Sequence, residues 1–220
     1  VCLNDPVFTL KATSPPGGTW SGKGVSNGKF DPATAGVGRH KVTYSIGSGT
    51  CATSDDIFVT VDNLPSISLG SALSKCLNNA PFDLKSQASP TGGYWWGTGL
   101  TDTVDGTFDP ATAGKGNHTV YYRATNSKGC SDTSSLGITV NDTPQVEAFP
   151  LTACSIGGNI PLKSNPSSGG TWSGQYVSGT NFQAGVSGTG QYIVTYSITN
   201  SNNCTSTDTA LVTIISAQAI

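Results

Sequence analysis

The feature that most constrains this sequence is a six-residue stretch that occurs three times. It reads Gly-Gly-Thr-Trp-Ser-Gly at 17–22, Gly-Gly-Tyr-Trp-Trp-Gly at 92–97 and Gly-Gly-Thr-Trp-Ser-Gly at 169–174. The equivalent tryptophans are 75 and 77 positions apart (95 − 20 and 172 − 95). A period of this size indicates one small folding unit written three times. We therefore expect three domains, at residues 1–63, 64–142 and 143–220.

Within each repeat, short segments of alternating apolar and polar residues follow one another in the same order. The longest of them in the first repeat, residues 40–46, carries Val42, Tyr44 and Ile46 on one face, as a half-buried strand should. The last strand places Ile57 and Val59 on one face in the same way. No segment has helical spacing over more than one turn. This pattern predicts an all-β chain of immunoglobulin-like β-sandwich domains.

Two smaller predictions concern the ends of these segments. Asp31-Pro32 and Asp109-Pro110 each fit the cap and first position of a single helical turn, and Gln183 has lost that cap in the third repeat. Residues 67–69 and 146–148 supply an extra first strand in the second and third repeats, which the first repeat lacks before Cys2. We therefore expect the chain to be part of a longer array.

Composition and charge exclude several classes of function. A net charge of −2 gives no electrostatic attraction to nucleic acid or to an anionic membrane surface. No run of eighteen apolar residues is present, so we expect no membrane insertion. The linkers between repeats are about three residues long, and linkers so short favour an elongated rod of domains with limited bending.

The six cysteines occur two per repeat, which favours disulfides in an oxidising compartment over a zinc site. The even distribution favours pairing within each repeat, as Cys2–Cys51, Cys76–Cys130 and Cys154–Cys204. Each bond would close a loop of about fifty residues and contribute ~4 kcal/mol. A simple immunoglobulin topology puts the two cysteines of a repeat at opposite ends of their domain. It therefore leaves open a pair between neighbouring repeats, such as Cys76–Cys204.

One ordered motif covers the whole chain. Its elements, in order, are Cys-Leu-Asn, Gly-Gly-x-Trp-x-Gly, Phe-Asp-Pro-Ala-x-Ala-Gly, Val-x-Tyr, Cys and Val-x-Val. It resembles the immunoglobulin/PKD-like repeats of very large surface proteins in Bacteroidota, including the SprB-type adhesins of gliding motility. The third repeat departs from the motif at Gln183 and Tyr192. The resemblance implies secretion through the type IX route and display on the bacterial outer-membrane surface.

No set of residues fits catalysis, so we expect a protein that is not an enzyme and holds no cofactor. Gly24-Val25-Ser26-Asn27-Gly28 matches the nucleophile elbow of hydrolases, but it lacks the strand–turn–helix context and a histidine–acid pair. His40 and His118 belong to different domains and are expected at the edges of their cores. Asp55-Asp56, Asp62 and Asp142 are too few carboxylates for a good Ca²⁺ shell, so no metal site is predicted.

The middle repeat alone carries extra aromatic residues on its surface. If Trp95 points into the core, Tyr94 and Trp96 point outward from the same strand. Tyr121 and Arg123 occupy the outward positions of the neighbouring long strand, where the first repeat has Thr43 and Ser45. Such a strip could stack sugar rings, and it could equally be a set of cross-strand pairs that stabilise the sheet. Tyr94, Trp96, Tyr121 and Arg123 are therefore the candidate glycan-binding residues.

Two threonines match a short modification pattern. By resemblance to secreted Bacteroidota proteins, Asp102-Thr103-Val104 and Asp208-Thr209-Ala210 fit an Asp-Ser/Thr-apolar signal for O-glycosylation. Thr103 and Thr209 are the candidate sites.

Taken together, the sequence favours a non-enzymatic structural or adhesive segment of a secreted cell-surface adhesin, involved in gliding motility or surface attachment. Its expected partners are neighbouring repeats of the same chain and a surface polysaccharide or substratum. The alternative is a carbohydrate-binding or spacer module of a secreted multidomain enzyme.

Overall fold

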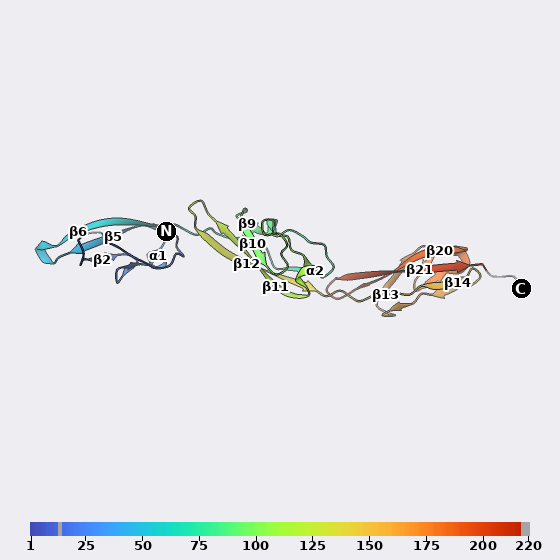
Figure 1. The fold of residues 1–220 in the computed structure, drawn as a ribbon. Helices are drawn as coiled ribbons and strands as arrows, with labels where there is room; N and C mark the ends of the chain where they lie inside the picture. Colours follow the sequence, from blue (N-terminus) through green and yellow to red (C-terminus); the bar gives the residue numbers. More distant parts are fainter. Residues whose placement is uncertain (13–14, 217–220) are drawn as a thin grey trace. The chain divides into compact units, whose positions relative to one another are not determined.

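The computed structural model describes residues 1–12 and 15–216, and in these ranges most of the regular secondary structure is β-strand (Figure 1). Contacts within the chain divide it into two compact units. The first comprises residues 1–72, 82–108 and 119–137, and the second comprises residues 73–81, 109–118 and 138–220. The middle repeat therefore contributes to both units.

The first repeat, which lies wholly in the first unit, forms two sheets, with strand orders β2-β5-β6 and β1-β4-β3. Leu10, Phe30, Val42 and Val61 from both sheets meet in one buried core, as in a β-sandwich. The elements are β1 (Phe8–Thr9), β2 (Thr19–Gly22), β3 (Val25–Ser26), β4 (Lys29–Phe30), α1 (Pro32–Ala35), β5 (Gly38–Ile46), the 3₁₀ turn η1 (Gly49–Cys51) and β6 (Thr53–Val61).

The middle repeat has a four-stranded sheet of order β10-β11-β12-β8 and a short pair, β7 with β9. Its large buried side chains are Leu84, Trp95, Phe108 and Tyr122. Its elements are β7 (Ser68–Leu69), β8 (Leu73–Cys76), the 3₁₀ turn η2 (Lys85–Gln87), β9 (Ala88–Ser89), β10 (Tyr94–Gly97), α2 (Pro110–Ala113), β11 (Gly116–Thr125) and β12 (Ser131–Asn141).

The third repeat, in the second unit, repeats this plan with sheets of order β14-β21-β20-β17 and β15-β19-β18 and the pair β13-β16. Phe182, Val194, Tyr196 and Val212 are the centre of its core. Its elements are β13 (Glu147–Ala148), β14 (Leu151–Cys154), β15 (Asn159–Pro161), β16 (Ser164–Asn165), β17 (Thr171–Gly174), β18 (Val177–Ser178), β19 (Asn181–Gln183), α3 (Ala184–Ser187), β20 (Gly190–Thr199) and β21 (Thr205–Ile215).

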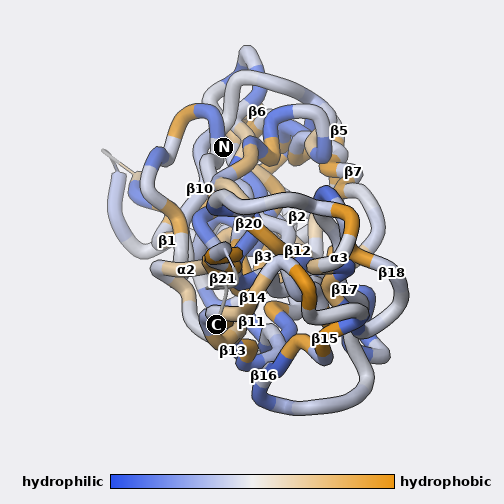
Figure 2. The backbone as a smooth tube through the Cα atoms, turned by 90° about the vertical axis from the view of Figure 1, so that its right-hand side faces the viewer, coloured by the Kyte–Doolittle hydropathy of each residue, from blue (hydrophilic) through white to orange (hydrophobic). Residues whose placement is uncertain are grey.

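The predicted helical turns and first strands are present. Asp31 and Asp109 accept hydrogen bonds from the backbone N–H groups of Ala33 and Ala111, whereas Gln183 makes no such bond. The first strands are β7 and β13. Figure 2 shows strongly hydrophobic and strongly hydrophilic residues interspersed along the backbone.

The second glycine and the tryptophan of each Gly-Gly-x-Trp stretch pack against a tyrosine of the neighbouring long strand. In the middle repeat Gly92 has a φ of +87°, and the N–H of Gly93 donates to the hydroxyl of Tyr122 at 2.7 Å. The Trp95 ring lies against the Tyr122 ring, with centroids 4.7 Å apart. The other two repeats repeat this arrangement, with Gly18 and Gly170 donating to Tyr44 and Tyr196. The second glycine is required because a Cβ atom there would collide with the tyrosine ring.

This packing predicts a large effect of one methyl group. Gly93→Ala places a Cβ atom against the Arg123 carbonyl oxygen and the Tyr122 ring, so we expect it to destabilise the protein by about 3 kcal/mol. Gly137→Ala is the matched control, since its Cβ would be an ordinary 3.9 Å from the Cβ of Ala72. Urea unfolding followed by tryptophan fluorescence measures both. Equal stabilities of the two variants would contradict this account.

The last strand of each repeat is joined in parallel by the segment that ends at the first cysteine. β12 and β21 each pair in parallel with a further strand, β8 and β14, which the sequence analysis did not predict. In the first repeat, residues 1–3 take the same place beside the end of β6. Cys2 and Asp62 form a parallel bridge, the N–H of Leu3 donates to the carbonyl of Asp62, and the N–H of Asp62 donates to the carbonyl of Val1.

Candidate functional site: an aromatic strip and the disulfide joints

The middle repeat displays the predicted aromatic strip, which we define as Tyr94, Trp96, Tyr121 and Arg123. β10 and β11 are antiparallel neighbours, and their register sets Tyr94 opposite Arg123 and Trp96 opposite Tyr121. Trp95, between the two outward aromatics of β10, is 1% exposed and fills the core. Tyr94, Trp96 and Tyr121 are 45%, 36% and 40% exposed. The alternation of a strand therefore places these side chains on the surface, as predicted.

The rings of the strip pack on one another. The Trp96 and Tyr121 rings are stacked, with centroids 5.4 Å apart and planes 18° apart. The Tyr94 ring lies 5.4 Å from the Trp96 ring, and Nη1 of Arg123 donates to its hydroxyl at 3.5 Å. Cross-strand aromatic contacts of this kind stabilise a sheet by themselves. These contacts account for a reinforced sheet, and the binding of sugars by the exposed side chains stays a prediction.

The strip differs from the other repeats at all four positions together. The same register in the first repeat pairs Thr19 with Ser45 and Ser21 with Thr43. The third repeat pairs Thr171 with Ser197 and Ser173 with Thr195. Both carry two threonines and two serines where the middle repeat has three aromatic rings and an arginine. Since small polar residues satisfy this sheet face twice, the fold does not require the aromatic strip.

The cysteines pair between repeats, which corrects the within-repeat pairing expected from their even distribution. Cys2 is bonded to Cys130 and Cys76 to Cys204, each with a sequence separation of 128 residues. The cause is the parallel pairing of β8 with β12, which sets Cys76 beside Asn141 at the end of the last strand of its repeat. The first cysteine of a repeat therefore lies beside the linker, within reach of the next repeat. Cys51 and Cys154, also predicted in disulfides, are exposed and unpaired among the described residues.

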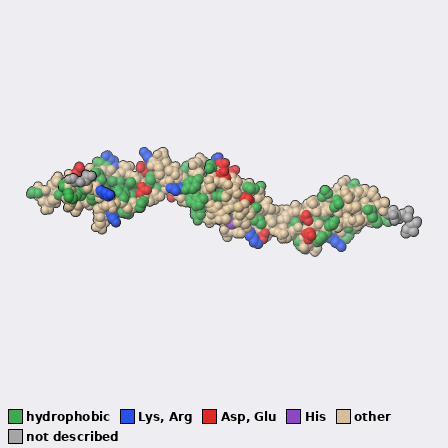
Figure 3. All heavy atoms as spheres, in the orientation of Figure 1, with side chains coloured by type: hydrophobic (Ala, Val, Ile, Leu, Met, Phe, Trp, Pro, Cys, Tyr) green, Lys and Arg blue, Asp and Glu red, His purple; other side chains and the backbone are tan. Residues whose placement is uncertain are grey.

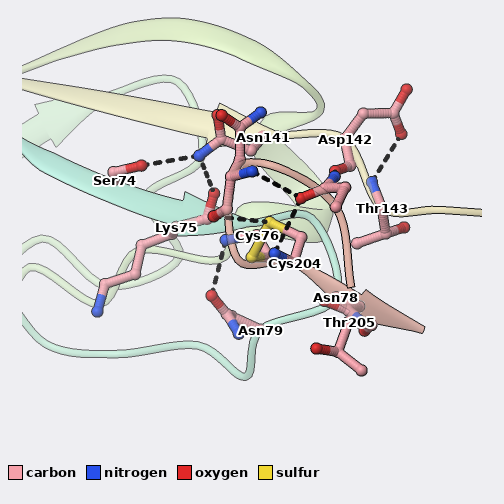
Figure 4. Close-up of a disulfide and its surroundings, with 12 residues drawn as sticks. Ser74, Lys75, Cys76, Asn78, Asn79, Asn141, Asp142, Thr143, Cys204 and Thr205 are labelled. Carbon is pink, nitrogen blue, oxygen red and sulfur yellow. Dashed lines mark hydrogen bonds between the residues drawn. A yellow bond between two sulfur atoms is a disulfide. The ribbon is translucent and has the colours of Figure 1, made fainter. Parts of the chain in front are cut away.

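Each disulfide is the centre of a hydrogen-bonded joint, drawn for Cys76–Cys204 in Figure 4. Asn78 donates from its side chain to the carbonyl of Thr205 at 2.8 Å, and Asn200 donates to the carbonyl of Asp142 at 2.9 Å. The Asn200 amide oxygen also accepts from the N–H of Cys204, which fixes the cysteine loop. Cys204 is 0% exposed in this setting.

The joint at Cys2–Cys130 has the same contacts. Asn4 donates to the carbonyl of Ser131 at 3.1 Å, and Asn126 donates to the carbonyl of Asn63 at 2.8 Å. Each contact therefore joins one repeat either to the first residue of the neighbouring repeat's last strand or to the linker between the two. The sequence-based predictions did not include these asparagines, although their fixed spacing from the cysteines, two after the first and four before the second, was a visible signal.

The remaining candidate residues are separate from the strip and the joints. Nε2 of His40 and of His118 lies within hydrogen-bonding distance of the carbonyls of Gly36 and Gly114, at the end of each helical turn. Tyr192 donates to the carbonyl of Ser187 in the third repeat. These side chains hold the turn that follows each helix. Thr103 and Thr209 are both exposed, and their modification remains a prediction.

Two of the acidic residues considered for Ca²⁺, Asp56 and Asp142, are engaged with lysines. The Lys41 ammonium lies 2.8 Å from the Asp56 carboxylate and lowers its pKa, with help from the Thr43 hydroxyl. Lys115, 3.0 Å from Asp142, lowers the pKa of that carboxyl through a hydrogen bond. Among residues 1–12 and 15–216, no three His, Cys, Asp or Glu side chains group as metal ligands would. On the face drawn in Figure 3, side chains of both charges are scattered.

No helix in the described ranges is long and apolar enough to cross a membrane. No protein-family model matches the sequence, and no curated protein matches it significantly. The similarity found is to solved structures.

A SusE-like surface-located polysaccharide-binding protein of Bacteroides thetaiotaomicron is 9% identical, with a TM-score of 0.36, over 91% of this chain and 54% of that one. The insect immune protein hemolin is 15% identical, with a TM-score of 0.30, over 80% of this chain and 56% of its own. The first four extracellular domains of Drosophila N-cadherin are 12% identical, with a TM-score of 0.29, over 98% and 72%. Similarities of this size assign the chain to no family.

Proposed function

We propose that this chain is a non-enzymatic, load-bearing segment of a repetitive protein displayed outside the cell, in which disulfides carry tension from one repeat to the next. The observation that carries the proposal is the pair of joints. Two disulfides with the same sequence separation each connect the first cysteine of one repeat to the second cysteine of the next, and the same asparagine contacts surround each. Covalent bonds placed at the linkers protect the weakest points of a tandem array.

The joints change the path that tension follows. A force that enters at Cys2 crosses to Cys130, passes through the middle repeat to Cys76 and crosses again to Cys204. The stretches 3–75 and 131–203 lie outside this shortest covalent path. Most of the first and third repeats and both linkers are then shielded. Each repeat of a longer array would carry load only between its own two cysteines.

Attachment to a surface is the function that such a design serves. Many weakly binding copies held together by covalent joints gain avidity without high affinity at any one site. The finer assignment, a SprB-type adhesin on the outer-membrane surface of a gliding bacterium, is supported by the sequence motifs alone. Extension of single molecules under force, with and without reduction, tests the load-bearing role. A reduced and an oxidised chain of equal full length would contradict it.

The strip gives a specific reason for a second candidate function, carbohydrate binding. Flat aromatic side chains on an exposed sheet stack against the apolar faces of sugar rings, and Arg123 supplies donors for sugar hydroxyls or acidic groups. This binding role fits an adhesin segment and also a module attached to a secreted enzyme. The binding role is supported by the four strip positions, which differ together from the threonines and serines of the other two repeats although the fold does not require the change.

A matched substitution tests the strip. Tyr94→Thr, Trp96→Ser, Tyr121→Thr and Arg123→Ser together recreate the sheet face of the first and third repeats. We expect this variant to bind polysaccharides in a retardation gel about tenfold or more weakly, which corresponds to a loss of about 1.4 kcal/mol or more in binding free energy. The control is Gly137→Ala, which leaves the strip intact. Equal retardation of parent and variant, or no retardation of either by a broad polysaccharide panel, would exclude the binding role.

A further inference from the structure

The two unpaired cysteines are complementary halves of the same joint. Cys154 ends β14 as Cys76 ends β8, and the parallel pairing with the last strand sets Cys154 beside Ile215 as it sets Cys76 beside Asn141. Cys51 lies in the loop between β5 and β6, the place that Cys130 and Cys204 occupy between β11 and β12 and between β20 and β21. Cys154 thus occupies the position of the first cysteine of a repeat, and Cys51 occupies that of the second. Neither has a disulfide partner among the described residues.

The turn after Cys154 has the same backbone hydrogen bonds as the turn after Cys76. The carbonyl of Cys154 accepts from the N–H of Gly157 at 2.9 Å, as the carbonyl of Cys76 accepts from Asn79 at 3.0 Å. The next N–H, of Ser155, donates to Ile215, as the N–H of Leu77 donates to Asn141. Both disulfide-bonded first cysteines have this turn. Cys2 and Cys76 are the positions equivalent to Cys154 in the other two repeats, and each of them forms a disulfide.

We propose that Cys154 and Cys51 form this same disulfide with further repeats of this kind, so that Cys154 of one copy of the chain bonds to Cys51 of a second copy. The inference rests on the proposed function, since it extends the covalent path of tension beyond the chain. The partner is a repeat that presents a second cysteine, and a second copy of this chain is the form of it available for experiment.

The bond forms by two exchange reactions with a low-molecular-weight disulfide such as oxidised glutathione. The Cys154 thiolate attacks one sulfur, the glutathione disulfide breaks, and a glutathione thiolate leaves and takes up the proton that Cys154 lost. The Cys51 thiolate of the second copy then attacks the Cys154 sulfur of the mixed disulfide and releases the second glutathione thiolate, which is protonated likewise. Two cysteine thiols are oxidised, and one glutathione disulfide is reduced to two thiols.

The joint between copies lacks the asparagine contacts of the inner joints. Gly47 stands where Asn126 and Asn200 fix the second cysteine's loop, and Ile156 stands where Asn4 and Asn78 donate across the joint. Ile156 is 80% exposed. The copies therefore associate through the disulfide and a smaller set of non-covalent contacts, so the linked species should separate on reduction.

Two complementary variants test this inference. Cys51→Ser leaves Cys154 as the one unpaired cysteine, and Cys154→Ser leaves Cys51. The two variants, one carrying a mass tag, are mixed and oxidised with glutathione disulfide, and the dimers are resolved on non-reducing gels and mapped by mass spectrometry. We expect a Cys154–Cys51 heterodimer several-fold in excess over either homodimer, and the statistical mixture when the same oxidation is done in urea.

A statistical mixture under native conditions would overturn the inference, because it would show random thiol collision in place of a directed joint. The inference would also be overturned if both variants stayed monomeric, each with its one thiol still reduced. The double variant Cys51→Ser/Cys154→Ser must remain monomeric as the control. Since this double variant keeps both inner disulfides, its behaviour under force reports on the proposed function separately: it can fulfil that function while the inference on Cys51 and Cys154 fails.

Discussion

Pulled from residue 1 to residue 220, the oxidised Cys51→Ser/Cys154→Ser variant is expected to reach a full extension of roughly 260 Å, and the reduced variant roughly 770 Å, at about 3.5 Å per residue. The oxidised chain is short because the taut path runs through both disulfides. Apart from the first residue, this path includes only the segment from Cys76 to Cys130 and the segment that follows Cys204. All other residues are slack at full extension.

The choice of this variant makes the measurement discriminate between the two pairings. If the cysteines paired within repeats, removing Cys51 and Cys154 would leave one bond, Cys76–Cys130, and the full extension would be roughly 580 Å at about 3.5 Å per residue. In the parent chain the two pairings give nearly equal lengths. An extension near this intermediate length would therefore contradict the joints. An oxidised variant that extends as far as the reduced one would show that neither bond forms.

Loss of one joint is expected to cost several kcal/mol. Cys76→Ala/Cys204→Ala removes a cross-link with a sequence separation of 128 residues, for which the chain-entropy model gives about 5 kcal/mol. The asparagine contacts of Asn78 and Asn200 remain in this variant, so the joint keeps part of its non-covalent support. Urea unfolding of the variant and of the parent, with hydrogen exchange at the β21 amides, measures the difference.

The control for this experiment is again Cys51→Ser/Cys154→Ser, which removes two exposed thiols and should change the free energy of unfolding little. Treatment of the parent with a reducing agent should reproduce the loss seen in Cys76→Ala/Cys204→Ala, increased by the loss of the second joint. A difference below about 1 kcal/mol between variant and parent would contradict the entropic account of the cross-link.

Much of the fold could be predicted because local chemistry specifies it. The alternation at residues 40–46 predicts a strand, and β5 runs through Gly38–Ile46. Asp31 before Pro32 predicts a capped helical turn, and α1 begins at Pro32. Trp95 between two outward aromatics predicts the strip, since a strand has a period of two. Each of these predictions depends on residues near one another in the sequence.

The cysteine pairing could not be derived this way, because it depends on which ends of the domains meet. Cys76 comes beside Asn141 through the parallel pairing of β8 with β12, two strands that lie far apart in the sequence. The short strand Leu73–Cys76 carries too little pattern to reveal itself. The even count of cysteines favoured closed pairs within repeats, and the long-range pairing of strands overrides it.

The sequence by itself thus determined the repeat, the strands and the outward face of the aromatic strip, because period-two alternation and capping act over a few residues. The tertiary structure alone decided where the cysteines meet and which two remain open. It also showed why the Gly-Gly-x-Trp stretch has its second glycine. The Gly93 N–H meets the Tyr122 hydroxyl, and a side chain there would collide with a strand that comes much later in the chain.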